Sequence, residues 1–188
     1  MILSREDLRY YIQEDAKRNG YNRGILYYWL SLLYGRENAY AFKYLKLLRH
    51  CEYHTNNSGL VHKLLSIYYQ MRVNRLGMRL NLSIPINKCG YGLRLCHLSG
   101  GGGILLNVKS VGNYCGFNSG VLIGNNNAID AIPTIGNNTA FGPGSKAFGN
   151  ISIGNHVFVA SNSVVVSDIE DNSIVGGVPA RFIKKNKY

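Results

Sequence analysis

From residue 111 onward, an apolar side chain recurs at every sixth position, and this period constrains the fold more than any other feature. The positions that follow the rule are Val111, Phe117, Ile123, Ile129, Ile135, Phe141, Ala147, Ile153, Val159 and Val165. Glycine directly follows several of them, at 112, 124, 136, 142 and 154. A short and fixed period of this kind is typical of a solenoid, in which each repeat packs only against its neighbours.

A second pattern lies four residues after most of these positions, where the side chain is small or β-branched. Its members are Cys115, Val121, Thr139, Ser145, Val157 and Ser163. We therefore predict a parallel β-helix with three of these six-residue repeats, or hexads, in each coil. The apolar residue of a hexad points inward, and the small residue packs beside it at the bend. Glycine and asparagine, as in IGNN and IGNH, suit the tight corners because they tolerate positive φ.

Residues 1–80 follow a helical period instead. We predict three or four helices there, the first starting at Ser4, which is followed three residues later by an acid as in a capping box. Gly35 is expected to end a helix, and the polar stretch at 51–59 to separate two helices. The predicted fold is mainly β, with a small N-terminal α-helical region at 1–80 and a β-helix domain with a C-terminal tail at 81–188.

The formal net charge of +11 is concentrated in the helical region, where 13 Lys and Arg face 6 Asp and Glu and where 11 of the 14 tyrosines lie. Solvated helix faces over aromatic cores explain this composition as well as contact with an anionic surface does. No nucleic-acid motif accompanies the charge, so we expect no nucleic-acid partner.

The cysteines and the N-terminal sequence bear on the compartment. The four cysteines include no CxxC pair, which indicates thiols in a reducing compartment. The N-terminal residues MILSREDLRYY lack the apolar core of a signal peptide, and the best apolar run, at 25–34, is about half as long as a membrane-spanning helix. We expect a cytoplasmic protein.

The hexads, together with SIVGGVPARFIKK at 173–185, resemble the left-handed β-helix acyltransferases that use acetyl-CoA. Within that group, GLRLCHLSGGGG at 92–103 and the residues at 140–166 are similar to segments of the serine acetyltransferases. The resemblance covers roughly residues 84–185. It implies a left-handed coil, a homotrimer, acetyl-CoA as co-substrate, and no metal. Further pairing of two trimers through the N-terminal helices stays open.

The resemblance also implies a catalytic residue, because the histidine that matches His97 is the general base of serine acetyltransferases. It takes the proton of an acceptor hydroxyl, which attacks the thioester directly. An imidazole titrates near neutral pH, and a positioned general base contributes on the order of 10²–10⁴-fold to the rate. Without the surrounding motif, the same histidine would be interpreted as a packed or surface residue.

The residues implied to contact coenzyme A fall into two groups. Gly142, Gly144, Ala160 and Ser161 would line the pantetheine arm, and Arg181, Lys184 and Lys185 would lie near the nucleotide phosphates. An alternative stays open, in which the coil itself demands small residues and the terminal cations only aid solubility. Pro143 departs from the family pattern, and its nitrogen carries no hydrogen to donate.

Other departures concern the acceptor. Leu82 stands where serine acetyltransferases have an aspartate that orients the base, and no acid lies between Glu52 and Asp130. We therefore expect His97 to be held by a backbone carbonyl, by Asn107 or by Asn113. Ala131 and Ile132 replace an arginine–histidine pair that engages serine in the family. The stretch at 123–138 keeps the six-residue period, but the resemblance predicts a shortened loop there, from Asn125 to Pro133.

The branch most similar to this chain is associated with surface polysaccharide synthesis, which implies a sugar hydroxyl as acceptor. The residues expected to contact this sugar are Asn107, Asn113, Asn118, Asn125 and Asp130, although turn residues of a β-helix would look the same. For a lipid-linked precursor, the basic helices are suited to rest on the inner membrane face.

Three other functions remain open. One is serine O-acetylation in cysteine synthesis, and another is a non-catalytic trimeric scaffold. The third is a γ-type carbonic anhydrase, which needs three zinc-binding histidines, whereas the repeats contain only His97 and His156.

Overall fold

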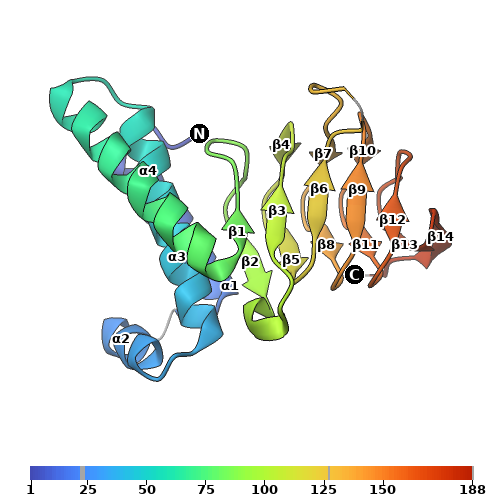
Figure 1. Cartoon of the computed structure of the whole chain (residues 1–188), viewed down its shortest axis with the longest axis horizontal. Helices are drawn as coiled ribbons and strands as arrows, with labels where there is room; N and C mark the ends of the chain where they lie inside the picture. Colours follow the sequence, from blue (N-terminus) through green and yellow to red (C-terminus); the bar gives the residue numbers. More distant parts are fainter. Residues whose placement is uncertain (22–23, 127, 188) are drawn as a thin grey trace.

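The computed structural model describes residues 1–21, 24–126 and 128–187. Its helices are α1 (Arg5–Arg18), α2 (Ile25–Leu33), α3 (Glu37–Thr55) and α4 (Leu60–Leu80). Figure 1 shows them gathered at one end of an elongated molecule, with the strands stacked along the rest. The predicted fold, a helical region followed by a β-helix, is confirmed.

The helix boundaries agree with the sequence patterns in most places. The Ser4 side chain accepts a hydrogen bond from the Asp7 backbone, and the Asp7 carboxylate accepts one from the Ser4 backbone, which completes the capping box. Gly35 follows α2 with a φ of +71°. The predicted break at 51–59 is wrong in its first half, because α3 continues to Thr55. Cys51 and Glu52 are buried, so tertiary packing outweighs the polar look of this stretch.

The strands form three sheets, and the coils of the β-helix pass from one sheet to the next. The first sheet contains β1 (Leu82–Ser83), β3 (Ile104–Leu106), β6 (Leu122–Gly124), β9 (Lys146–Phe148) and β12 (Val164–Val165). The second contains β4 (Ser110–Val111), β7 (Thr134–Ile135) and β10 (Ser152–Ile153). The third contains β2 (Arg94–Cys96), β5 (Gly116–Asn118), β8 (Ala140–Phe141), β11 (Phe158–Val159), β13 (Ser173–Gly177) and β14 (Ala180–Lys185). Pairing between successive coils is parallel, and β14 folds back antiparallel on β13.

The chain turns from one sheet to the next along three edges of the prism. The histidine edge, from the third sheet to the first, consists of 97–103, 119–121, 142–145 and 160–163. The loop edge, from the first to the second, consists of 107–109, 125–126, 128–133 and 149–151. The asparagine edge, from the second to the third, consists of 112–115, 136–139, 154–157 and 170–172. A short 3₁₀ helix, η1 (Leu98–Gly100), lies on the histidine edge.

The predicted coil of three hexads holds only in part of the molecule. Ile135 pairs with Ile153, three hexads later, whereas Val111 pairs with Ile135, four hexads later. The additional hexad belongs to the loop between β6 and β7, where the resemblance predicted a loop. Ile129 is 86% exposed in this loop, so the six-residue period is wrong at that position.

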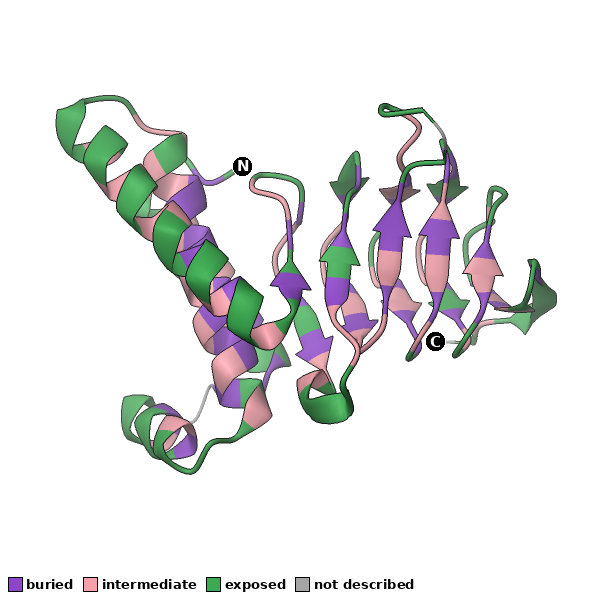
Figure 2. Ribbon diagram, in the orientation of Figure 1, coloured by how far each residue is buried: buried purple, intermediate pink, exposed green. Residues whose placement is uncertain are grey.

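The interior of the prism is built from the two predicted sets of residues. Apart from Ile129, every apolar hexad position is buried, and so are all six small or β-branched positions. Figure 2 shows this burial continuing from coil to coil. Phe117 and Phe141 stack across adjacent coils with 5.5 Å between ring centroids. Since burying one such side chain contributes about 1.5–3 kcal/mol, this column stabilises the β-helix.

A buried charge network joins the helices to the first coil. The Arg49 guanidinium, with no exposed surface on its side chain, contacts Asp15 at 2.9 Å and Glu52 at 2.9 Å. It also donates to the carbonyl of Cys89 at 3.0 Å, and Asp15 accepts from the backbone N–H of Leu93 at 2.9 Å. The chain that leads into β2 is therefore fixed from the helical side.

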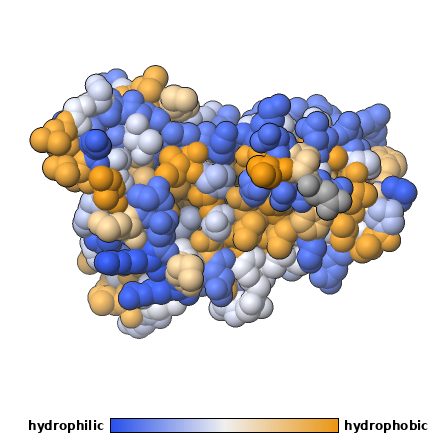
Figure 3. Space-filling view, turned by 45° about the horizontal axis from the view of Figure 1, so that its top comes forward, coloured by the Kyte–Doolittle hydropathy of each residue, from blue (hydrophilic) through white to orange (hydrophobic). Residues whose placement is uncertain are grey.

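Two helices expose apolar faces. On α2 these residues are Ile25, Leu26, Trp29, Leu30 and Leu33, and on α4 they are Leu60, Val61, Leu64, Ile67, Met71 and Met78. Figure 3 shows hydrophobic residues at the helical end of the molecule and also along the β-helix. In the part of the chain that the structure describes, no helix combines the length and apolar character needed to cross a membrane.

Candidate functional site

His97 begins the turn that leads from β2 to β3 on the histidine edge. Its backbone lies in the left-handed region, with a φ of +58°, and its side chain is exposed to solvent. The Gly100 N–H donates to the His97 carbonyl at 3.0 Å, which closes η1 directly after it. The structure thus presents an accessible imidazole at a sharply bent point of the backbone.

Glu37, in the first turn of α3, holds this turn from outside the β-helix. Its carboxylate accepts from the Ser99 hydroxyl at 2.6 Å and from the Ser99 backbone N–H at 3.2 Å. The Ser99 hydroxyl is the main cause that lowers the pKa of Glu37, and the backbone N–H groups of Ser99 and His97 and the charge of His97 lower it further. Burial acts in the opposite direction but does not prevail.

The carboxylate of Glu37 therefore holds the histidine turn at Ser99. The sequence analysis named a backbone carbonyl, Asn107 or Asn113 as the partner of His97, but Asn107 lies on the loop edge and Asn113 on the asparagine edge. The acid at the turn comes from 62 residues before Ser99, in the helical region. No local signal in the sequence indicates such a contact.

Four of the residues expected to line the pantetheine arm lie on the same edge as His97. Gly142 and Gly144 occupy the turn two coils further on, and Ala160 and Ser161 occupy the next turn. At about 4.8 Å between neighbouring strands, these turns extend roughly 10–15 Å from the histidine turn. The structure therefore brings the four residues and His97 into one line along the prism.

The close approach of neighbouring coils also requires small residues on this edge. A Cβ added to Gly142 would lie 2.7 Å from the backbone nitrogen of Ser161, which is closer than real Cβ contacts. Pro143 is exposed, and its carbonyl accepts from the Asn162 N–H at 2.9 Å. Packing between the coils thus accounts for Gly142 whether or not a ligand lies there.

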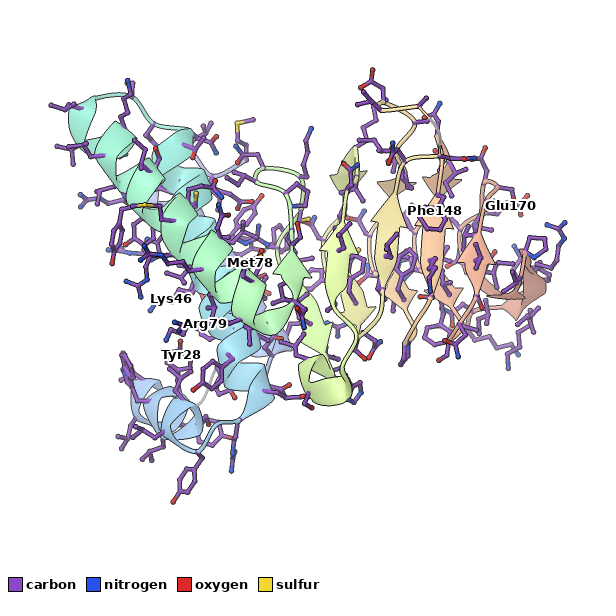
Figure 4. All side chains as sticks on the ribbon, in the orientation of Figure 1. Tyr28, Lys46, Met78, Arg79, Phe148 and Glu170 are labelled. Carbon is purple, nitrogen blue, oxygen red and sulfur yellow. The ribbon has the colours of Figure 1, made fainter. Side chains whose placement is uncertain are left out.

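The predicted phosphate-contacting cations are spread along β14. Arg181 pairs with Gly176, at the end of β14 that adjoins the histidine edge. Lys184 and Lys185 lie at the other end of the strand, opposite Ile174 and Ser173. Lys185 approaches Glu170 at 3.8 Å, and both side chains are largely exposed; Figure 4 labels Glu170 at the end of the molecule away from the helices. Only Arg181 of the three is placed beside the edge that carries His97.

The five residues expected to contact an acceptor do not meet at one point of this chain. Asn118 ends β5, where it pairs with Cys96, and it donates its side-chain amide to the Phe141 carbonyl at 2.7 Å. Asn107, Asn125 and Asp130 lie on the loop edge, across the first sheet from His97.

Asn113 belongs to a ladder along the asparagine edge. Its side-chain oxygen accepts from the Tyr91 N–H, and its own N–H donates to the side chain of Asn137. The same bond repeats from Asn137 to Asn155 and from Asn155 to Asp171, at 2.8 and 2.7 Å. These hydrogen bonds are those of a turn residue of the β-helix, and contact of Asn113 with an acceptor stays a prediction.

Two cavities beside the histidine turn were not predicted from the sequence. One, of about 530 Å³, lies between the end of α4 and the first sheet, where its lining includes Met78, Gly101, Leu105 and Leu122. The other, of about 320 Å³, is lined by Gly35, Glu37, Tyr40, Arg79, Leu80, Asn81, Leu98 and Ser99. Figure 4 labels Met78 and Arg79 in the last turn of α4. Glycines at 101 and 103, within the run of four glycines at 100–103, line the first cavity.

The cysteines and the metal-binding side chains add little to the site. All four cysteines are free, and burial raises the pKa of Cys89 to about 12, so this thiol is inert at neutral pH. Among residues 1–21, 24–126 and 128–187, no three His, Cys, Asp or Glu side chains are grouped so that they would hold a metal ion.

Comparison with curated proteins finds relatives over part of the chain. The serine acetyltransferase of Synechococcus elongatus is 34% identical over 104 residues, which cover 54% of this chain and 42% of that protein. The serine acetyltransferase of Helicobacter pylori is 31% identical over 105 residues, which cover 55% of this chain and 60% of that protein. The chain thus spans about half the length of the curated relatives it matches. No family model matches it.

Solved structures agree over nearly the whole chain. Serine acetyltransferase from Brucella abortus superposes with a TM-score of 0.67 at 20% identity, covering 96% of this chain and 70% of that one. The chain has the serine acetyltransferase fold. The Neisseria gonorrhoeae protein in complex with serine gives a TM-score of 0.69 at 25% identity, covering 96% and 71% of the two chains. Another matching structure is the Brucella abortus protein in complex with coenzyme A. None of these comparisons supports the predicted polysaccharide branch.

Proposed function

We propose that this protein is an acetyl-CoA-dependent O-acetyltransferase with His97 as its general base. The observation that carries the proposal is the single line formed by an exposed His97 and by Gly142, Gly144, Ala160 and Ser161 on the histidine edge. The similarity to serine acetyltransferases supports the activity, and the related structure in complex with coenzyme A supports the co-substrate. Arg181, at the end of this edge, is the cation best placed to meet a phosphate.

In the proposed reaction, the His97 imidazole takes the proton of the acceptor hydroxyl. The hydroxyl oxygen attacks the thioester carbonyl, so that a C–O bond forms and the C–S bond breaks. The leaving coenzyme A sulfur then receives the proton from the imidazolium. Each turnover thus produces an O-acetyl ester and free coenzyme A and restores the neutral base.

Serine is the acceptor that the comparisons favour over a sugar. The relatives are named serine acetyltransferase, and one of the matching structures is a complex with serine. A sugar hydroxyl remains the second candidate because of Ala131 and Ile132, which offer no side-chain group that binds a carboxylate. The two candidates share the base and the co-substrate and differ only in the acceptor.

The test is a steady-state assay of acetyl-CoA turnover with L-serine and with a panel of sugars and nucleotide sugars. Saturation by serine in the millimolar range would exclude the sugar, and turnover with a sugar alone would exclude serine.

The base is tested with H97N and, as a matched control, H156N. Both histidines have positive φ, +58° and +55°, which asparagine tolerates, so neither change strains the backbone. We expect H97N to lose at least about 10²-fold in kcat, as is usual for a general base, and H156N to keep the wild-type rate. Unchanged transfer by H97N would show that His97 is not the base.

The assembly belongs to the same proposal. We expect a homotrimer with coenzyme A in the groove between neighbouring β-helices, and further pairing through the N-terminal helices. The exposed apolar faces of α2 and α4 support contact with another surface, and the inner membrane face stays an alternative occupant. Light scattering gives the mass of the assembly, and flotation with anionic vesicles tests the membrane. The cytoplasmic location stays a prediction.

A further inference from the structure

The turn that follows His97 consists largely of glycine, so few of its own side chains can fix its conformation. After η1 it continues through Gly101, Gly102 and Gly103, which carry no side chains. Gly101 has a φ of +79°, and a Cβ on Gly103 would lie 2.5 Å from the Asn81 carbonyl oxygen. The Gly103 carbonyl accepts from the Gly120 N–H at 2.8 Å, and Leu98 packs against the hydrophobic core. A run of glycines loses more conformational freedom on ordering than other residues do, so contacts from outside the run keep this turn in one conformation.

Glu37 supplies such a contact. Its carboxylate binds both the hydroxyl and the backbone N–H of Ser99, two residues after His97. It lies in the first turn of α3, where the helix dipole favours a negative charge. Hydrogen bonds to an ionised acceptor are about twice as strong as neutral ones, so this pair is a firm link between the helices and the turn.

The helix that carries Glu37 is itself held rigidly. Leu45 and Leu48, on the same helix, are fully buried in the core cluster that continues into the β-helix. Arg49 of α3 binds the carbonyls at 89 and 90 within the first coil. A carboxylate mounted on this helix therefore has a fixed position relative to the β-helix.

We propose that Glu37 is the positioning residue of His97, fixing the turn through Ser99 so that the imidazole faces the glycine-lined edge. Serine acetyltransferases have an orienting aspartate at the position of Leu82. Glu37 performs the same role from a different position in the chain. Glu37 acts through Ser99 and the backbone and not on the reacting atoms. This inference rests on the proposed role of His97 as the base.

The experiment compares the full-length variants E37A, S99A and the double variant E37A/S99A with E6A as matched control. Glu6 is likewise a first-turn glutamate, of α1, and it is exposed. We expect E37A and S99A each to lower kcat roughly 10- to 100-fold, as misplacement of a reacting group does, with the KM for acetyl-CoA within about twofold of wild type. The double variant should be no slower than the slower single variant, because one contact is lost in all three.

Conservative variants separate positioning from general stability. S99T keeps the hydroxyl and should restore most of the rate lost in S99A, and E37Q keeps one acceptor oxygen and should fall between wild type and E37A. If E37A does not fold, the pair S99A and S99T still decides the question.

Two results would overturn the inference: a kcat near wild type in S99A, or equal losses in E37A and E6A. Its failure is distinguishable from failure of the proposed function, because H97N would then remain inactive. An active H97N would instead remove the base and this inference together.

Discussion

Gly142 and Gly124 show how differently two glycines of one solenoid are constrained. Gly142 packs against the next coil, where an added Cβ would lie 2.7 Å from the Ser161 nitrogen. Gly124 ends β6 beside the long loop, and an added Cβ there would meet nothing within 4 Å. Sequence alone cannot separate them, because both follow an apolar hexad position and belong to the same repeating pattern.

The two glycines therefore make a matched pair of alanine substitutions. We expect G142A to lower the free energy of unfolding by about 1–3 kcal/mol, because the backbone of neighbouring coils must move apart to admit the methyl group. G124A should change it by less than about 0.5 kcal/mol. Urea unfolding followed by circular dichroism measures both. Equal effects would show that the coils do not approach as closely as described.

At the scale of elements, the six-residue period predicts the β-helix well and fails at one place for a geometric reason. The loop between β6 and β7 lengthens its coil from three hexads to four, which is an insertion of one full repeat. An insertion of that length leaves every later apolar residue in phase, so Ile129 matches the pattern although it lies outside the prism. Periodicity detects the face that a residue would occupy and not whether its coil contains an additional segment.

The insertion can be tested by removal. Deleting residues 126–131 would leave Ile123 and Ile135 six positions apart, as Ala147 and Ile153 are in a regular coil. We expect this variant to keep its β-sheet circular dichroism, with a melting temperature within about 5 °C of wild type, since residues 126 and 128–130 are exposed and contribute little to the core.

A control deletion of 137–142 removes the same number of residues from a regular coil. It would move every later strand to the wrong sheet, and we expect it to unfold the domain. Loss of structure on removing 126–131 would show that the loop supports the fold.

At the scale of the whole molecule, the sequence predicts the two regions but not the contacts between them. His97 and the small residues of its edge follow from motifs that are local in sequence. The link from Glu37 to Ser99 and the ion network around Arg49 join residues that lie far apart in the chain, and hydrophobic patterning carries no signal for either. The scattering of the expected acceptor residues over different edges is likewise a result of coil geometry.

The Arg49 network should therefore control the stability of the joined regions. Burial alone would lower the pKa of Arg49, but Asp15 and Glu52 outweigh it, so the guanidinium stays charged. We expect R49M to lower the free energy of unfolding by about 3–5 kcal/mol, because two buried carboxylates lose their partner. R72M, on the exposed surface of α4, should cost less than about 0.5 kcal/mol. Denaturant unfolding measures both, and equal values would contradict the burial of the network.

The antiparallel strand β14 has a consequence for association. A stack of parallel coils ends in a row of unpaired backbone groups, which can template the addition of another molecule end to end. Here α3 and α4 pack at one end of the prism, and at the other end β14 covers β13. The outer strand carries Arg181, Lys184 and Lys185, whose like charges repel a second copy. The last strand of the third sheet is thereby protected against end-to-end addition of a second copy.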